Sequence, residues 1–597
     1  MASSYWNDLL SRRLTRRRAL ATMGATAAGA SLLAACGGID EATDKSSFLA
    51  KPADSSSKAV PGGVWQTATT EPVSLDPNAN RRTPDAEHFS LVYSNLLRYG
   101  RTTDGSRPSS TTISGDAAES FELAPDGLQV TLRLRPNHKF DPRPPTNGHA
   151  MTSVDVKVSW ERTIAMSPFA PDLLHSRNEF GPVDSVSFPD DKTVVFKLAF
   201  PFRTFIEMLA YHTFFWIVPR EAEQFNIKAE TRGSGPFFLT EWAPSAFTEY
   251  KKNPDWYVKS RPFLDGIRAT IIPDYPAALA QFEAGAIWDY AINQEDVLRT
   301  KTNHQEMVMT RNLRAPAGQD ITWFMMASSR EDSPLRDIRV RQAAPMLIDR
   351  DLYISTLFNT EAFVNAGVPT KTYWNNHLGG ESANWLDPKT NAIGDGQKFF
   401  KFDPAEAKKL LSAAGYDKAP PQISYWSRGT GGALDKRYLI MGQMLRDGGL
   451  NLDEQSLETQ TTWRQTCQAS ETIGQGWSGW CINTSGALNE AEHLASKYTP
   501  EGKFRLNYRQ IPGITDLVRK ARVELDANRQ SDLIKQIQRE LAVQWLDMPQ
   551  PGYADRYDLT WPWLKNYGVF TDGGYEPNWS SSRVRTEYWY DASAKPS

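Results

Sequence analysis

The sequence has 597 residues, of which only three are cysteines, and it offers little that could serve a membrane or a nucleic acid. After residue 35 no charge-free apolar run approaches the roughly 18 residues that a membrane-spanning helix needs. No block of Lys and Arg occurs there either, which argues against nucleic acid as a partner. The formal net charge is −3, and removing residues 1–35 takes away five arginines and one aspartate and leaves −7.

The spacings typical of catalysis are missing as well. No Gly-x-x-x-x-Gly-Lys-[Ser/Thr] phosphate loop and no His-Glu-x-x-His motif occurs, and the eight histidines have no ligand spacing. The run from Gly476 to Trp480 begins like a nucleophile elbow but lacks the final glycine. The sequence therefore predicts a protein that is not an enzyme, with no catalytic residue, no cofactor and no metal site.

The N-terminus carries an export pattern. Thr15-Arg16-Arg17-Arg18-Ala19-Leu20 follows the twin-arginine pattern, and the charge-free run from Ala19 to Ala35 is too short for a dependable span. The run ends in Leu-Ala-Ala-Cys, so we expect residues 1–35 to be a Tat-type lipoprotein signal peptide and Cys36 to carry the lipid. The extra arginines leave the general secretory route open. The alternatives are an ordinary signal peptide with a chance cysteine or, less favoured, a cytosolic protein with a basic tail.

Residues 36–61 are rich in Ser, Asp and Pro and are predicted to form a flexible tether. The mature protein would then lie outside the cytoplasm, lipid-anchored to the outer face of the cytoplasmic membrane, periplasmic or at the cell surface. An oxidising compartment permits Cys467 and Cys481 to form a disulfide. Closing a loop of about 15 residues would contribute on the order of 3 kcal/mol. Two free buried thiols are the alternative.

Local patterns predict interleaved strands and helices. Hairpins are expected over 121–134 and 183–198, each turning at a Pro-Asp pair. Helices are expected over 154–164 after an N-cap at Thr152, and over 275–284, 337–348 and 403–414, with two more within 517–545. No repeat period is present, and the length exceeds one core, so two or three α/β or α+β lobes are expected.

Several blocks of the sequence resemble one known family, the family 5 extracellular solute-binding proteins of ABC importers (oligopeptide- and dipeptide-binding class). Each block alone is a weak match, but their order and spacing are also those of the family. The blocks include Glu71-Pro72-Val73-Ser74-Leu75-Asp76-Pro77, Leu132-Arg133-Leu134-Arg135-Pro136, Gly233-Ser234-Gly235-Pro236-Phe237, Asn253-Pro254-Asp255-Trp256-Tyr257 and Asp337-Ile338-Arg339-Val340-Arg341. The resemblance extends from Gly62 to the C-terminus.

The resemblance implies an α/β fold of the periplasmic-binding-protein type (type II, cluster C), a two-lobe flytrap with an additional α+β domain. When the family's division is applied to this sequence, lobe I would consist of residues 62–83, 217–312 and 552–597. Residues 84–216 would form the extra domain, and residues 313–551 would form lobe II. The implied function is capture of a peptide or peptide-like solute between the lobes by a monomer and its delivery to the permease subunits of an ABC importer.

The resemblance also implies where a solute would lie. A segment resembling Gly479-Trp480-Cys481-Ile482-Asn483 pairs its backbone with an extended peptide, which is β-augmentation. Trp480 would be an aromatic wall, and Asn483 stands where peptide binders carry an aspartate for the free ammonium. Asparagine loses that charge, so another acid replaces it or the solute lacks a free amino terminus.

The other candidate ligand-binding residues are Trp477, Trp426, Thr83 and Phe169. Trp477 and Trp480 could stack on sugar rings, so an oligosaccharide or other non-peptide solute is the alternative to a peptide. A surface hydrolase and a sensor lipoprotein remain as alternatives from other functional classes.

Overall fold

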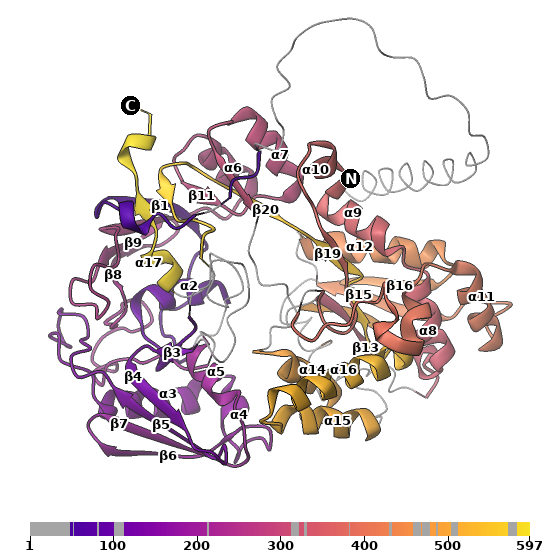
Figure 1. Ribbon diagram of the computed structural model, residues 1–597, viewed down its shortest axis with the longest axis horizontal. Helices are drawn as coiled ribbons and strands as arrows, with labels where there is room; N and C mark the ends of the chain where they lie inside the picture. Colours follow the sequence, from indigo (N-terminus) through magenta and orange to yellow (C-terminus); the bar gives the residue numbers. More distant parts are fainter. Residues whose placement is uncertain are drawn as a thin grey trace, which may run out of the picture.

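The computed structural model describes most of the chain after residue 47. The described residues are 48–51, 53–79, 83–100, 113–211, 214–311, 322–327, 331–380, 382–428, 433–457, 467, 478–484, 488–502, 512–570 and 582–596. Figure 1 shows two groups of elements, the N-terminal half of the chain on one side and most of the C-terminal half on the other, with β19 and β20 running between them. The predicted signal peptide and Cys36 lie outside the described residues.

The first lobe, as we call it, is built on a four-stranded sheet of order β1-β10-β9-β8 and a three-stranded sheet of order β11-β20-β12. Its strands are β1 (Val64–Thr69), β8 (Phe237–Ala243), β9 (Phe247–Lys252), β10 (Gly266–Ile271), β11 (Asp289–Tyr290), β12 (Val308–Arg311) and β20 (Tyr557–Thr560), and its helices are α2 (Thr83–Val92), α6 (Tyr275–Glu283), α7 (Gln294–Asn303) and α17 (Ser582–Thr586). The indole of Trp65 donates to the buried carboxylate of Asp289 at 2.8 Å, which ties β1 to β11.

The aromatic C-terminal segment belongs to this lobe. Trp561 and Trp563 stack with centroids 4.7 Å apart, and both are buried in the first-lobe core. The short strands β21 (Leu564–Lys565) and β22 (Trp589–Tyr590) pair beside them. These aromatic residues therefore form part of the first-lobe core.

The extra domain is an antiparallel sheet of order β4-β5-β7-β6 with helices beside it. Its elements are β2 (Leu97–Arg98), β3 (Ser114–Gly115), β4 (Ala118–Leu123), β5 (Gln129–Leu134), α3 (Ser153–Met166), α4 (Ala170–Leu173), β6 (Val183–Asp190), β7 (Thr193–Leu198) and α5 (Phe205–Ala210). Both predicted hairpins and the capping box at Thr152, with Asp155 at its third helical position, are confirmed. The core of this domain begins at Leu96, because α2 packs its Phe89 and Val92 into the first-lobe core instead.

The second lobe has a five-stranded sheet of order β16-β15-β17-β13-β18. Its strands are β13 (Thr322–Ala327), β15 (Gln422–Arg428), β16 (Asn451–Leu457), β17 (Gly479–Thr484) and β18 (Met548–Pro549), and its helices are α8 (Ile338–Met346), α9 (Arg350–Phe358), α10 (Thr360–Asn365), α11 (Pro404–Ala413), α12 (Ala433–Asp447), α14 (Glu490–Tyr498), α15 (Pro512–Val523) and α16 (Ala527–Gln544). One hydrophobic core lies around Tyr425 and Trp480, and another around Cys481 and α14 to α16.

The chain crosses between the lobes twice, once after Arg311 and once between β18 and β20. The two crossings are joined by an ion pair, since Nη2 of Arg311 lies 2.6 Å from Oδ1 of the buried Asp555. The other carboxylate oxygen of Asp555 accepts from the backbone N–H of Lys371 at 3.1 Å. Beside this point β14 (Thr372–Trp374) pairs with β19 (Gly552–Ala554).

Candidate functional site

Strand β17 lies inside the second-lobe sheet and is paired along only part of one edge. It pairs with β13 antiparallel over its whole length, from Gly479 opposite Ala327 to Thr484 opposite Thr322. Its other neighbour, the parallel β15, pairs only with positions 479 to 481. Within the described residues, positions 482 to 484 thus have a ladder partner on one side alone. A strand edge of this kind can accept a further extended chain.

Gly479 is required where β17 begins. A Cβ atom built there would lie 1.8 Å from the backbone oxygen of Ser424 in β15. The two strands approach this closely because the N–H of Ser424 also donates to the backbone oxygen of Ser478 at 2.8 Å. Gly479 therefore fixes where β17 meets β15, which sets where their pairing stops.

The expectation for the side chain of Trp480 is corrected by the structure. Trp480 is fully buried and belongs to the same core as Tyr425 and Met441. Trp480 and Cys481 point to opposite faces of β17 and both are buried, so a tryptophan here packs between sheet and helices instead of forming a wall for a solute.

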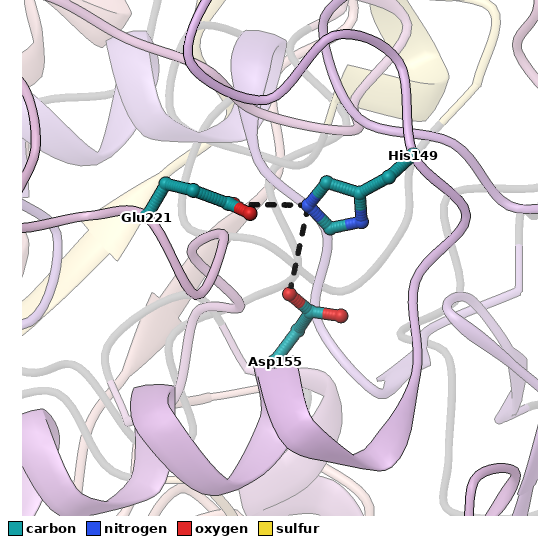
Figure 2. Close-up of side chains that lie close together, drawn as sticks. All are labelled: His149, Asp155 and Glu221. Carbon is teal, nitrogen blue, oxygen red and sulfur yellow. Dashed lines mark hydrogen bonds and ion pairs between the residues drawn. The ribbon is translucent and has the colours of Figure 1, made fainter.

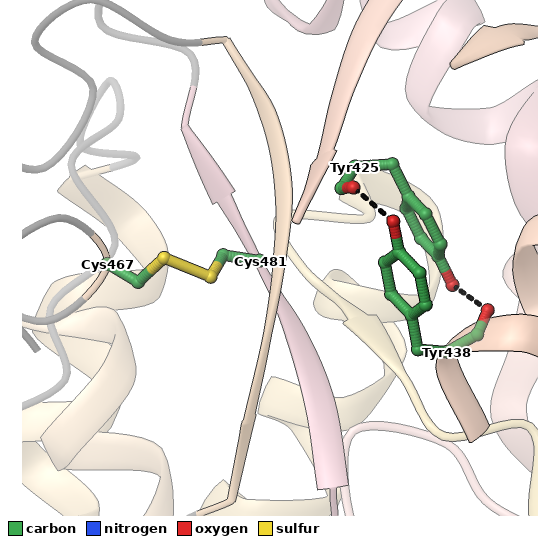
Figure 3. The surroundings of a disulfide bond; sticks show 4 residues. All are labelled: Tyr425, Tyr438, Cys467 and Cys481. Atoms are coloured by element: carbon green, nitrogen blue, oxygen red, sulfur yellow. Dashed lines mark hydrogen bonds between the residues drawn. A yellow bond between two sulfur atoms is a disulfide. The ribbon is translucent and has the colours of Figure 1, made fainter. Parts of the chain in front are cut away.

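Cys481 faces the other core and is bonded to Cys467. The sulfur atoms form a disulfide whose Cα atoms lie 6.3 Å apart, and both residues are fully buried (Figure 3). Behind the strand, Tyr425 and Tyr438 stack and exchange hydrogen bonds, each hydroxyl donating to the backbone oxygen of the other at 2.8 and 2.7 Å. Figure 3 thus shows β17 fixed from two sides: the disulfide holds it directly, and the tyrosine pair holds α12 against β15.

The remaining predicted site residues are not brought together by any contact that the structure describes. Trp426 is opposite Cys481 in the ladder and is 9% exposed, so it is largely core. Phe169 is half-buried and packs on Phe214 with centroids 6.2 Å apart. Thr83 begins α2, and Trp477 lies outside the described residues. The side chains of Thr83 and Asn483 lie outside them too, so the solute-contacting role of these residues stays a prediction.

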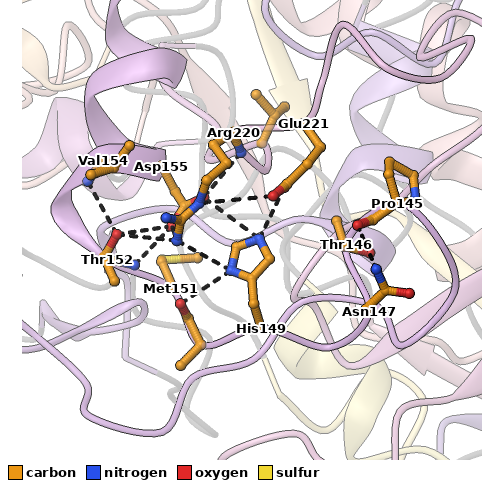
Figure 4. Close-up of polar contacts among 12 residues, drawn as sticks. Pro145, Thr146, Asn147, His149, Met151, Thr152, Val154, Asp155, Arg220 and Glu221 are labelled. Carbon is orange, nitrogen blue, oxygen red and sulfur yellow. Dashed lines mark hydrogen bonds and ion pairs between the residues drawn. The ribbon is translucent and has the colours of Figure 1, made fainter.

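One cluster has the composition of a metal site. His149, Asp155 and Glu221 place one ligand-type atom each within 4.8 Å of one another, and Nε2 of His149 lies 3.0 Å from Glu221 (Figure 2). Arg220 lies among them, with Nε and Nη2 donating to the two oxygens of Asp155 at 3.1 and 3.0 Å (Figure 4).

The carboxylate of Asp155 has further partners. It accepts from the backbone N–H groups of Thr152 and Arg220 at 2.8 and 3.0 Å. Its lone pairs are therefore used, and a guanidinium already supplies the positive charge that a cation would bring. The cluster fits an ion-pair network holding the start of α3 better than it fits a metal centre.

Sequence reasoning missed a buried charged cluster in the second lobe. Asp547 lies directly before β18. Its Oδ1 accepts from the hydroxyl of Tyr498 at 2.7 Å and lies 2.7 Å from Nδ1 of His377. Its Oδ2 accepts from Nζ of Lys497 at 3.2 Å. All four residues are 1% exposed or less.

Burial alone would raise the pKa of Asp547, but the charges of Lys497 and His377 hold that pKa well below its usual range. The residues come from three distant segments, and none has a distinctive local motif, so no sequence signal could have found the cluster. It acts as an anchor of the sheet that contains β17.

A large part of this chain matches one known protein family. The family model described as "Bacterial extracellular solute-binding proteins, family 5 Middle" matches residues 112–498. The glutathione-binding protein GsiB of Pectobacterium atrosepticum is 25% identical over 450 residues, which are 72% of this chain and 78% of that protein. A putative ABC transporter peptide-binding protein of Brucella ovis is 25% identical over 358 residues, 58% of this chain and 61% of that protein.

Solved structures agree on the architecture. DppA from Helicobacter pylori, in complex with peptide STSA, has a TM-score of 0.70 at 18% identity and covers 89% of this chain and 99% of its own. AgaA of A. tumefaciens R10, in complex with agropinic acid, has a TM-score of 0.68 at 21% identity and covers 88% of this chain and 98% of its own. The expected two-lobe binding-protein fold is thus confirmed. No helix in the described part of the chain is long and apolar enough to cross a membrane.

Proposed function

Because this chain belongs to family 5 of the bacterial extracellular solute-binding proteins, we propose that it captures a peptide or peptide-like solute between its lobes and delivers it to the permease of an ABC importer. The observation that supports this most directly is the strand edge at positions 482 to 484 of β17, which has no second partner among the described residues. An extended peptide can add there through main-chain hydrogen bonds and so bind with little dependence on its side chains. The relatives named above are binding proteins, which supports a function without turnover.

Capture requires no covalent step. A solute that contacts both lobes favours the closed arrangement by the difference between its affinities for the closed and open states. The two crossings joined by Arg311 and Asp555 are the proposed hinge. Residues 1–35 and Cys36 supply the proposed export signal and lipid anchor, which keep the protein near the membrane and its permease. The monomeric state and the domain boundaries expected from the sequence are part of this proposal, except that α2 goes to the first lobe, whose core it packs into.

Asn483 is the proposed specificity residue. It belongs to the open half of β17, and it replaces the aspartate that pairs with a peptide ammonium in the resembling segment. A neutral amide cannot compensate that charge, so we expect a solute whose terminal amine is blocked or absent to bind better than a free-amine peptide.

The experiment compares two probes, the peptide Ser-Thr-Ser-Ala and its N-acetylated form, by titration calorimetry. The native chain is expected to bind the acetylated form more tightly. The variant Asn483→Asp is expected to gain about tenfold in affinity for the free-amine form, the scale of one charge-assisted hydrogen bond. The matched control is Asn451→Asp, an exposed position at the start of β16 in the same sheet. An equal response of both variants would remove Asn483 from the solute terminus.

A non-peptide solute is the second candidate, favoured by the agropinic acid complex of a protein with the same fold. Native mass spectrometry of the purified full chain separates the two by identifying any co-purified solute. Recovery of sugars or sugar acids alone would overturn the peptide assignment. The buried position of Trp480 removes one of the two tryptophans on which an oligosaccharide was expected to stack.

A further inference from the structure

The extra domain touches the second lobe along a seam that lies far from the chain crossings. Figure 1 shows α4 and α5 of the extra domain beside α14 and α15 of the second lobe, while β19 and β20 cross at the other end of the molecule. We define the seam by Phe180, Thr204 and Glu207 on the extra domain and by Asn489, Glu492 and Arg522 on the second lobe.

Arg522 of α15 is the central residue of the seam. It is 7% exposed, and Nη2 donates to the backbone oxygen of Phe180 at 2.8 Å. Its guanidinium lies 4.2 Å from the ring centroid of Phe180 and 4.5 Å from that of Phe202, distances typical of cation–π contacts. On its own lobe, Nε donates to Glu492 at 2.8 Å.

Asn489, the N-cap of α14, makes the second polar contact. Its Oδ1 accepts from the N–H of Glu492 at 3.0 Å, which caps the helix. Its Nδ2 donates across the seam to Thr204 at 2.9 Å and to Glu207 at 3.2 Å.

Apolar side chains are exchanged across the same seam. Leu488, next to Asn489, is buried in the hydrophobic core of the extra domain. In the opposite direction, Phe180 packs against the core of the second lobe that contains α14 to α16.

The distribution of charge makes this contact reversible. Arg522 has its carboxylate partner on its own lobe, and the described residues that it meets across the seam offer it a carbonyl oxygen and ring faces. Separating the two parts therefore leaves the guanidinium still paired with Glu492. Breaking a buried ion pair between the parts would instead strand an uncompensated charge, which is far more costly.

We infer that the seam is a clasp that holds the extra domain against the second lobe without any solute, and that can open while Arg522 keeps its carboxylate partner Glu492. The clasp itself is independent of the solute. Its effect on capture rests on the proposed function: a clasped protein has part of the closure in place before solute binds, and its opening limits exchange of the solute.

Amide hydrogen exchange on the full chain, with no solute added, tests the clasp. The variant Asn489→Asp keeps an N-cap oxygen for α14, since Asp and Asn cap helices about equally. It loses both donors across the seam and places a carboxylate beside Glu207. We expect exchange to rise about tenfold in peptides covering 175–182 and 199–210 of the extra domain, the scale of one lost hydrogen bond to a charged group.

Arg522→Met provides the second variant, because it keeps the apolar stem and removes every contact of the guanidinium. The matched control is Arg529→Met, which changes an exposed arginine whose partner Glu524 belongs to the same lobe. Faster exchange at 175–182 and 199–210 in both seam variants, and not in the control, supports the clasp. Unchanged exchange in these extra-domain peptides in both seam variants overturns it. Since no solute is present, neither outcome depends on the proposed transport function.

Discussion

Replacing Asp547 by asparagine should destabilise the second lobe more than any change of surface charge. Asp547 is fully buried, and its Oδ2 is the carboxylate partner of the equally buried Lys497 ammonium. In Asp547→Asn the single amide oxygen can take the Oδ1 position and accept from Tyr498, which turns the NH2 group toward the ammonium, or it can face Lys497 as a neutral acceptor and lose Tyr498. Removing one partner of a buried ion pair typically costs about 3–5 kcal/mol, because the remaining charge stays in a medium of low polarity.

The dependence on pH has a defined sign. The pKa of Asp547 in the folded protein is held well below its usual range, while its pKa in the unfolded chain is about 3.9. The folded state therefore binds fewer protons here than the unfolded state. The stability that Asp547 contributes is fully present above about pH 4 and is lost as the pH falls further.

The assay is amide exchange in α14 and in the β13–β18 pair, measured at increasing urea concentrations, which reports the second lobe separately from the rest of the chain. The control is Glu406→Gln, which removes the partner of Lys409 in an exposed pair 2.9 Å long on α11 of the same lobe and should cost less than about 1 kcal/mol. The reasoning is refuted if the two variants lose similar stability, or if Asp547→Asn unfolds in acid as the native chain does.

Three further changes have expected outcomes. Cys467→Ser should lower the free energy of unfolding by about 3 kcal/mol, and reduction of the native bond to Cys481 should have the same effect. A melting temperature that does not change when reductant is added would count against the bond. Burial raises the pKa of Asp289 to about 7, so the folded state holds a proton that the unfolded state loses. The free energy of unfolding should then fall by about 4 kcal/mol between pH 4 and pH 7. Urea titrations across this range should show a weaker dependence on pH for Asp289→Asn. Arg220→Met should let Zn²⁺ raise the melting temperature, with no such gain in the native chain or after a second change, His149→Ala.

The elements that the sequence predicts well are those whose causes are local. The capping box at Thr152 joins residues three positions apart, and the glycines that end α6 and α11, Gly285 and Gly415, have φ values of +72° and +95°. Such signals depend on one turn of chain, so they survive in any tertiary context. The arrangement of lobes came from the resemblance and not from these patterns.

The site residues were harder to predict than these elements, because whether a side chain is buried depends on the tertiary structure. Alternation along β17 puts Trp480 and Cys481 on opposite faces, and the sequence alone cannot tell which face is covered. In this fold both are, one by the helices that pack on β15 and one by α14 to α16. The seam and the Asp547 cluster were missed for the same reason, since their residues lie up to 342 positions apart in the chain.

The proposed hinge and the proposed clasp together indicate which parts of this molecule would move. At the crossings, an ion pair joins Arg311 at the end of β12 to Asp555 between β19 and β20, so opening by separation there would break a charge pair. At the seam, Arg522 keeps Glu492 when the parts separate. Opening is therefore less costly at the seam, with the crossings as the pivot. The β17 edge belongs to the lobe that this motion displaces, and a peptide added to it would move with that lobe.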